Sequence, residues 1–380
     1  MLSKSVKWIL TLFFSYLASI FDSKRPPTMS LSQKLDTWYT DYGRTLPWRG
    51  ISDPYRIWLS EIILQQTRIE QGRDYYHRFV EAFPTVADLA AASEEQVLRL
   101  WQGLGYYSRA RNLHAAAQYI MDECGGAFPS DYQGILKLKG VGRYTAAAIA
   151  SFAFRLPHPV IDGNVYRFIS RLYGIATPIA TDAAYSEFEA LLLKKIDRHR
   201  PDRFNAALMD FGSLQCKPVP DCTACPFADE CNALKTGRVG VLPVKAAKAK
   251  PKDRWFYYFN LRWHADGVEY TLVEQREGKD IWRGLYQFPL METDKELTYS
   301  QLQAEANRFV EENLRLSPLI FHLSPSFRHQ LTHRTIHALF LEAELSLEPL
   351  LTTEKYRAIP TSEIKNIPVS RLIDKYLQTL

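Results

Sequence analysis

Four cysteines lie close together in the second half of the chain. Cys216, Cys222, Cys225 and Cys231 have the spacing C-x5-C-x2-C-x5-C, which places four thiols within 16 residues. Thiolates are soft ligands, and four of them in one short segment suit either a tetrahedral zinc ion or a [4Fe–4S] cluster. Clustered cysteines in a large chain indicate a metal centre in a reducing compartment rather than a disulfide framework.

Two carboxylates stand in apolar surroundings. Glu61 lies in IWLSEIILQQT, a predicted helix with apolar residues on nearly every side. Desolvation raises the pKa of such a carboxyl, which makes Glu61 a candidate general acid; otherwise it is a partly exposed helix residue. Asp162 lies in VIDGN and precedes the predicted helix VYRFISRL. It is either only the N-cap of that helix or an ionised catalytic group that the helix amides stabilise. Enzymes that cleave glycosidic bonds use one neutral carboxyl as the general acid and one charged carboxylate that acts on the sugar.

The pentapeptide LKGVG, residues 138–142, separates two predicted helices. Its glycines permit a positive φ and a close approach of another backbone. The helix that follows presents free N–H groups, which are a ready anion site. The segment is therefore either a phosphodiester-binding turn or an ordinary tight connection between helices.

The elements that must position these residues fall into two groups. Residues 30–231 show helical periodicity without convincing strands, including predicted helices over 130–138 and 143–154. Asp53 is expected to cap a helix with Pro54 at its first position, and Ser93 with Gln96 to form a capping box. After residue 254, alternating aromatic and polar residues predict strands, with a helix over 300–314 and one further strand over HQLTHRTIHALFLEAELS.

The two groups are separated by a basic segment, and the chain opens with an apolar one. Residues 235–253 are rich in Lys, Arg, Pro and Gly and are interpreted as an exposed linker. Residues 6–21 form an apolar run of 16, shorter than the roughly 20 residues of a spanning helix. We interpret residues 1–28 as an extension upstream of a start at Met29, and expect a cytoplasmic protein without a membrane partner. The net charge of +5 permits an anionic partner without proving one.

Several long motifs in fixed order resemble the A/G-specific adenine DNA glycosylases, the MutY family. The matching stretches are LPWR (46–49), SEIILQQT (60–67), WQGLGYYSRARNLHAAA (101–117), LKGVGRYTAAAI (138–149), VIDGNVYR (160–167), the four cysteines, GLYQFP (284–289) and HQLTH (329–333). The resemblance implies a mainly α helix-hairpin-helix glycosylase domain over 29–234 with a [4Fe–4S] loop at 216–231. It also implies an α+β Nudix-like (MutT-like) domain over 254–380. The implied activity is excision of adenine mispaired with 8-oxoguanine or guanine in double-stranded DNA, by a monomer associated with the nucleoid.

The resemblance also assigns roles to individual residues. Glu61 matches the acid that protonates adenine at N7, and Asp162 the carboxylate that stabilises or traps the sugar cation. Tyr144 and Asn164 match positions that assist these two. The residues that match DNA-binding positions are Trp48 and Arg49 near the adenine, Gln66 and Tyr106 as wedges in the duplex, Lys139, Gly140, Val141 and Gly142 at the backbone, and Leu331, Thr332 and His333 at the opposite base. The four cysteines match the cluster ligands.

Two features separate this sequence from neighbouring families. In endonuclease III enzymes a Lys that forms a Schiff base stands where this chain has Tyr144, and a phenol cannot do that chemistry. We therefore expect a monofunctional glycosylase with weak or no strand cleavage. Residues 284–313 lack the acidic run with which Nudix hydrolases hold Mg²⁺, so recognition without hydrolysis is expected of the second domain.

The sequence departs from the family pattern at several positions. The first cysteine gap is five residues where relatives usually have six, Lys139 replaces a Pro, and Ala206 stands where relatives often carry Gln or Glu. Leu331 and Thr332 replace the Phe and Ser of the family's Phe-Ser-His tip. The alternatives are an endonuclease III-like glycosylase/lyase, a non-catalytic iron–sulfur DNA-binding protein and a Nudix pyrophosphatase. Tyr144 argues against the glycosylase/lyase, and the presence of both Glu61 and Asp162 argues against a non-catalytic protein. The missing acidic run argues against a Nudix pyrophosphatase.

Overall fold

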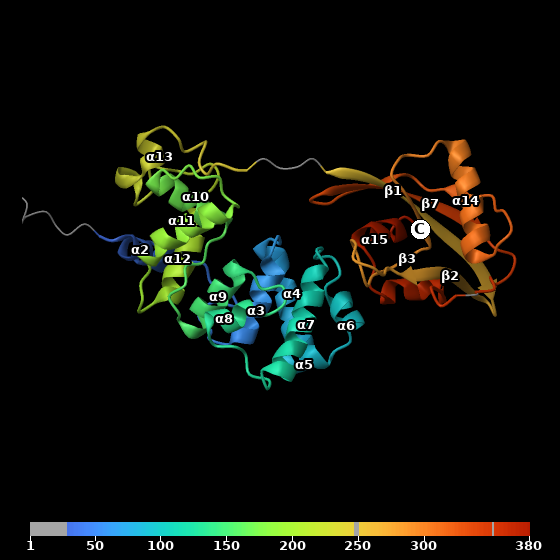
Figure 1. The fold of residues 1–380 in the computed structure, drawn as a ribbon, viewed down its shortest axis with the longest axis horizontal. Coiled ribbons are helices and arrows are strands. Elements are labelled where there is room, and N and C mark those ends of the chain that lie inside the picture. The colour runs from blue at the N-terminus through green and yellow to red at the C-terminus, as the bar shows by residue number, and fades with distance from the viewer. Residues whose placement is uncertain (1–28, 247–250, 352) are drawn as a thin grey trace, which may run out of the picture. The chain divides into compact units, whose positions relative to one another are not determined.

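The computed structural model describes residues 29–246, 251–351 and 353–380 (Figure 1). The predicted extension over 1–28 and part of the predicted linker lie outside these residues. The chain forms two compact units. The first combines the segment that ends at Leu46 with Arg155–Lys245, and the second combines Pro47–Phe154 with Ala246–Leu380. Within the described part of the chain, no helix is both long and apolar enough to cross a bilayer.

The first unit is helical and is built around an aromatic core. Trp38, Phe168, Phe211 and Phe227 form edge-on and tilted ring contacts at its centre. Burial of rings of this size is a dominant apolar contribution to a small helical unit. Its helices are α2 (Leu31–Tyr42), α10 (Gly163–Tyr173), α11 (Asp182–Leu193), α12 (Pro201–Leu214), the 3₁₀ helix η1 (Ala228–Glu230) and α13 (Asn232–Lys235).

The second unit begins with seven helices. They are α3 (Pro54–Leu64), α4 (Ile69–Ala82), α5 (Val86–Ala91), α6 (Glu94–Leu100), α7 (Ser108–Glu123), α8 (Tyr132–Leu136) and α9 (Arg143–Phe154). The predicted caps are confirmed: Asp53 accepts hydrogen bonds from the first amides of α3, and Ser93 with Gln96 forms the capping box of α6. The apolar helices α3 and α9 pack against each other, which brings Glu61 and Tyr144 together.

A mixed sheet makes up the rest of the second unit. Its strands are β1 (Lys252–Ala265), β2 (Val268–Gln275), β3 (Tyr286–Gln287), β4 (Leu290–Thr293), β5 (His322–Leu323), β6 (Phe327–Gln330), β7 (Arg334–Glu344) and β8 (Tyr356–Pro360). The long strands β1 and β7 are parallel, and the other pairings are antiparallel. Helix α14 (Tyr299–Leu314) covers one face, and α15 (Arg371–Leu377), which follows the 3₁₀ helix η2 (Thr361–Asn366), covers the other (Figure 1). The predicted fold class, mainly α followed by α+β, is confirmed.

One predicted strand is wrong. The stretch HQLTHRTIHALFLEAELS does not form a single strand, because β6 ends at Gln330 and β7 begins at Arg334. The two strands pair antiparallel with Gln330 opposite Thr335, and the amide of Leu331 donates to the carbonyl of Arg334 at 2.8 Å. No Gly or Pro marks this turn in the sequence, so the alternation seemed continuous. The turn places Leu331, Thr332 and His333 at the tip of a hairpin.

Candidate active site and cysteine pocket

Glu61 is a buried carboxyl in the last two turns of α3. Glu61 is only 6% exposed, and the neighbouring residues Ser60, Ile62 and Ile63 of α3 are also buried. The hydroxyl of Tyr144, from α9, donates to Oε2 of Glu61 at 2.8 Å. Burial of this kind favours the protonated form of a carboxyl group. The structure thus brings together the predicted acid and the residue predicted to assist it.

Asp162 is the N-cap of α10, as the sequence predicted. Its Oδ1 accepts from the amides of Asn164 and Val165 at 2.9 and 2.7 Å, and its Oδ2 accepts from Nδ2 of Asn164 at 2.8 Å. Burial nevertheless raises the pKa of Asp162, and the three hydrogen bonds and Arg167 only partly oppose it. The predicted cap is therefore confirmed, and its hydrogen bonds favour the carboxylate while burial acts in the opposite direction.

A chain of hydrogen bonds links Asp162 to the first cysteine. Nη2 of Arg167 donates to Oδ1 of Asn164 at 2.8 Å and to the carbonyl of Gly212 at 2.6 Å, while its Nε donates to the carbonyl of Cys216 at 2.8 Å. Asn164 in turn holds Asp162. One guanidinium thus joins the start of α10, the end of α12 and the cysteine segment within the first unit.

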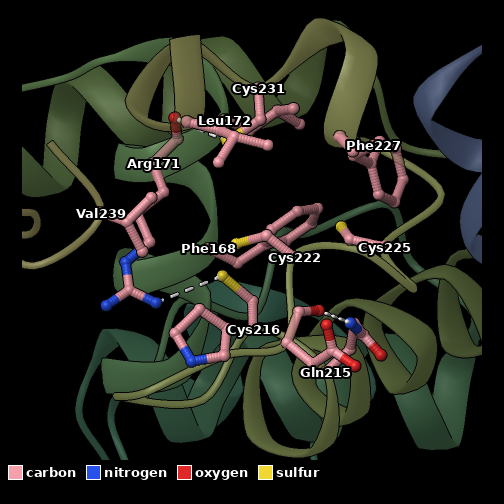
Figure 2. Close-up of a pocket in the computed structure, with 14 residues that line it drawn as sticks. Phe168, Arg171, Leu172, Gln215, Cys216, Cys222, Cys225, Phe227, Cys231 and Val239 are labelled. Atoms are coloured by element: carbon pink, nitrogen blue, oxygen red, sulfur yellow. Dashed lines mark hydrogen bonds between the residues drawn. The ribbon is translucent and has the colours of Figure 1, made fainter. Parts of the chain in front are cut away.

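The four predicted cysteine ligands line one pocket (Figure 2). Its apolar walls include Phe168, Leu172 and Phe227, and the guanidinium of Arg171 lies 3.6 Å from the sulfur of Cys216. Burial raises the pKa of Cys225 to about 11 and also raises the pKa of Cys216. Thiolates in such surroundings require a cationic centre among them.

The side chains of the four cysteines share one pocket and form the donor set of a soft-metal centre. No group of three or more His, Cys, Asp or Glu side chains among the described residues could hold one metal ion. A tetrahedral zinc site would bring four sulfurs to about 2.3 Å from one point. Four thiols around one shared pocket suit a soft-metal centre, and the donor set by itself is compatible with zinc or with an iron–sulfur cluster.

Two predicted DNA-binding residues have unusual backbone conformations. Gln66, just beyond α3, has φ of 59°, and Tyr106, just before α7, has φ of 48°. Both side chains are exposed, Tyr106 to 52%. Left-handed backbone is uncommon for residues other than glycine and is found preferentially at functional sites. The two residues predicted to lie near the adenine are less exposed. Trp48 is buried against Tyr76, and Arg49 lies over the ring of Phe152.

The turn between α8 and α9 presents a small, open surface. Lys139 and Gly142 are exposed, Val141 is buried, and Gly140 has φ of +80°. A Cβ on Gly140 would come within 2.7 Å of the Cβ of Asn112, whereas one on Gly142 would meet nothing within 4 Å. The two glycines thus serve different purposes: one permits the turn, and the other leaves the start of α9 uncovered.

The hairpin tip of the sheet contacts the helical part of the second unit. The hydroxyls of Thr332 and Tyr106 lie 2.8 Å apart. Leu331 packs partly against the core of the sheet, and His333 is exposed while its carbonyl accepts from the amide of Lys252. The structure therefore joins a residue predicted to enter the duplex to one predicted to read the opposite base.

Comparison with known proteins agrees with both halves of this architecture. The family model for HhH-GPD superfamily base excision DNA repair proteins matches residues 59–196, and a NUDIX domain model matches 261–379. The adenine DNA glycosylase of Buchnera aphidicola subsp. Baizongia pistaciae is 33% identical over 82% of this chain and 85% of its own length. That of Arabidopsis thaliana is 32% identical over 76% of this chain and 51% of its own. A solved thermostable thymine-DNA glycosylase superposes with a TM-score of 0.51 at 26% identity, over 54% of this chain and 95% of its own.

The chain belongs to the adenine DNA glycosylase family. It is a DNA-binding enzyme of base-excision repair, with a helical HhH-GPD part and a Nudix-like part. The predicted carboxylates of this glycosylase reside in different compact units, Glu61 in the second and Asp162 in the first.

The sequence did not single out two polar side chains that hold the site. Arg167 ends the motif VIDGNVYR, and only its spacing of three residues from Asn164 on one helix could have suggested their contact. Asn205 is fully buried; its Oδ1 accepts from the amide of Val160 and its Nδ2 donates to the carbonyl of His158, both at 2.9 Å. It fixes the segment that leads to Asp162. Ala206, beside it, is buried in the first unit.

Proposed function

We propose that this glycosylase excises adenine mispaired with 8-oxoguanine or guanine. The observation that carries the proposal is the buried Glu61 carboxyl with the Tyr144 hydroxyl at 2.8 Å. A carboxyl shielded from water retains a proton that it can deliver to a base nitrogen. Family membership supports the choice of adenine, because the relatives matched over most of the chain are adenine DNA glycosylases.

In this mechanism Glu61 acts on the adenine base and Asp162 acts on the sugar. Glu61 transfers its proton to N7 of adenine, and the N-glycosidic bond breaks with its electron pair leaving on the base. Asp162, as a carboxylate, stabilises the oxocarbenium-like sugar or bonds to its anomeric carbon transiently, before water completes the abasic product. Tyr144 orients Glu61 and Asn164 orients Asp162, through the hydrogen bonds already described.

We assign recognition of the duplex to residues of both parts. Lys139, Gly140, Val141 and Gly142 hold the phosphodiester backbone, to which the amides at the start of α9 are suited. Gln66 and Tyr106 enter the duplex beside the extruded adenine, and Trp48 and Arg49 border its pocket. Leu331, Thr332 and His333 read the opposite base. The enzyme acts as a monomer on chromosomal DNA, with functional domains over 29–234 and 254–380 joined by 235–253.

The four cysteines are assigned to a [4Fe–4S] cluster. Cys216, Cys222, Cys225 and Cys231 would supply the thiolates, and Arg171 would offset part of their charge at Cys216. Such a cluster would crosslink these segments and would supply no group that reacts with the substrate. Arg167 bonds to the carbonyl of Cys216 and to the side chain of Asn164, which in turn bonds to Asp162. These hydrogen bonds connect the cysteine segment to Asp162.

A glycosylase assay on matched duplexes tests the proposed substrate. We expect excision of adenine opposite 8-oxoguanine and guanine, with less opposite cytosine. Comparable removal of thymine glycol would instead favour the endonuclease III-like alternative.

Tyr144 predicts that base excision is not accompanied by Schiff-base chemistry. Because a phenol forms no imine with the sugar, borohydride should trap little enzyme on the excised DNA. Trapping in high yield would contradict a monofunctional enzyme.

A further inference from the structure

The side chain of Arg109 is buried in the second unit, where backbone carbonyls surround it. The residue is 8% exposed and projects from the first turn of α7. Its Nη1 donates to the carbonyls of Ile62, Ile63 and Gln65 at 2.8, 3.0 and 2.5 Å. Its Nη2 donates to the carbonyls of Leu104 and Gly105 at 3.3 and 3.2 Å. One guanidinium therefore bonds to two segments that lie about 40 residues apart in the sequence.

Those carbonyls occupy particular places in the chain. Ile62 and Ile63 lie in the last turn of α3, where helical carbonyls lack intrahelical partners, directly after Glu61. Gln65 and Gly105 precede Gln66 and Tyr106, so Arg109 holds the peptide bond that leads into each left-handed residue. The guanidinium also lies over the ring of Tyr106, 5.8 Å from its centroid.

The conformation of these two turns needs external support. A non-glycine residue in the left-handed region costs about 1–2 kcal/mol, and such residues persist only where their surroundings determine them. A planar guanidinium carries five N–H donors on three nitrogens and can therefore bond to two separate segments, whereas the three donors of a lysine ammonium all lie on one nitrogen. Burial lowers the pKa of Arg109 to about 10, so it remains cationic and retains all its donors at neutral pH.

We propose that Arg109 is a positioning residue that sets both duplex-entering side chains, Gln66 and Tyr106, and the end of the helix that carries Glu61. The inference rests on the proposed function of those side chains. Arg109 touches neither DNA nor the reacting atoms in this scheme. It acts by fixing the direction in which two strained turns present their side chains to the duplex.

The test compares Arg109→Lys with Arg111→Lys in the full chain. Arg111 lies on the same helix, but its Nη1 donates to a single carbonyl, that of Arg283, at 2.6 Å, so it serves as the matched control. Single-turnover excision is measured on an adenine·8-oxoguanine duplex. Base extrusion is followed by the fluorescence of 2-aminopurine placed next to the adenine, and affinity is measured on an undamaged duplex.

For Arg109→Lys we expect excision to fall about 100-fold, the loss typical of catalytic geometry displaced by about 1 Å. The fluorescence change should shrink, while affinity for undamaged duplex should remain within about threefold, because phosphate contacts dominate that affinity. Arg111→Lys should retain excision and the fluorescence change. A change in base extrusion without a change in binding is not expected of a residue that only stabilises the fold.

Normal excision and fluorescence in Arg109→Lys, at a temperature well below its unfolding transition, would overturn the inference. If that variant does not fold, Arg109→Gln replaces it, and failure of both to fold would assign Arg109 to stability alone. A wild-type enzyme that extrudes the base but excises no adenine would count against the proposed substrate. The comparison of fluorescence changes would still decide the role of Arg109.

Discussion

At the scale of single residues, the two carboxyls are distinguished by their neighbours. Glu61 lies buried in an apolar helix, and burial favours the neutral form of a carboxyl group, whereas the hydrogen bond that it accepts from the Tyr144 phenol favours the charged form. Asp162 accepts two amide hydrogen bonds and one from Asn164, which favour the carboxylate, yet burial raises its pKa. The two carboxyls therefore meet different donors, a phenol at Glu61 and the first amides of α10 at Asp162, and the two proposed roles differ accordingly.

Replacing the carboxyl of Glu61 tests its proton directly. Glu61→Gln keeps an oxygen for the Tyr144 hydroxyl but carries no transferable proton. Positioned acid catalysis contributes about 10²–10⁴-fold, so single-turnover excision should fall by at least about 100-fold. Affinity for the mispaired duplex, measured by fluorescence anisotropy, should be unchanged. Residual excision above about a tenth of the wild-type rate would exclude the general-acid role.

The raised pKa of Asp162 predicts the acid side of the pH profile. The mechanism needs Asp162 ionised, so excision should increase as pH rises through its pKa, and that limb should lie above the usual Asp range near 3.9. Asn164→Ala removes a hydrogen bond that lowers this pKa, so the limb should move to still higher pH. Single-turnover rates across the acidic range measure both. A limb that moves to lower pH in the variant would contradict this account.

At the scale of elements, the connection between α8 and α9 depends on one of its two glycines. Gly140 adopts a positive φ and packs closely against Asn112, while Gly142 is open to solvent. The connection therefore needs a glycine at position 140 for its backbone conformation, whereas Gly142 leaves the backbone at the start of α9 uncovered. This difference can be measured as stability, apart from any role in DNA binding.

Gly140→Ala should lower the free energy of unfolding by at least about 1–2 kcal/mol, the cost of left-handed backbone with a Cβ. The contact with Asn112, at 2.7 Å from the added carbon, should increase the loss. Gly142→Ala, the matched control, should leave stability unchanged or raise it by about 0.4–1 kcal/mol through the unfolded state. Urea unfolding compares the two. Equal losses in both variants would show that the conformation of Gly140 is not what matters.

At the scale of the whole molecule, the Nudix-like part is tied to the helical part of its unit. Thr332 contacts Tyr106, and the hydroxyl of Tyr107 donates to the carbonyl of Val369 at 3.2 Å. Arg99 and Arg111 each donate to a further carbonyl of the Nudix-like part. These contacts suit a part that reads one base of a duplex while the helices act on the other.

The Nudix-like part is expected to recognise without hydrolysing. Residues 284–313 form β3, β4 and α14 but contain no acidic run that could hold Mg²⁺. The enzyme should release no pyrophosphate from 8-oxo-dGTP in the presence of Mg²⁺. Thr332→Ala should instead reduce the preference for adenine opposite 8-oxoguanine over adenine opposite guanine. Hydrolysis of the nucleotide at enzymatic rates would reverse the assignment.

The sequence by itself determined that a mainly helical part precedes an α+β part, the caps at Asp53, Ser93 and Asp162, and the family. Each of these is set by local propensity or by a contiguous motif. The hairpin tip at Leu331 was misjudged because its turn has no glycine or proline. Only tertiary structure showed that burial outweighs the cap at Asp162, that Tyr144 bonds to Glu61, and that Arg109 joins two distant turns. Desolvation and contacts between remote segments depend on packing, which no local pattern encodes.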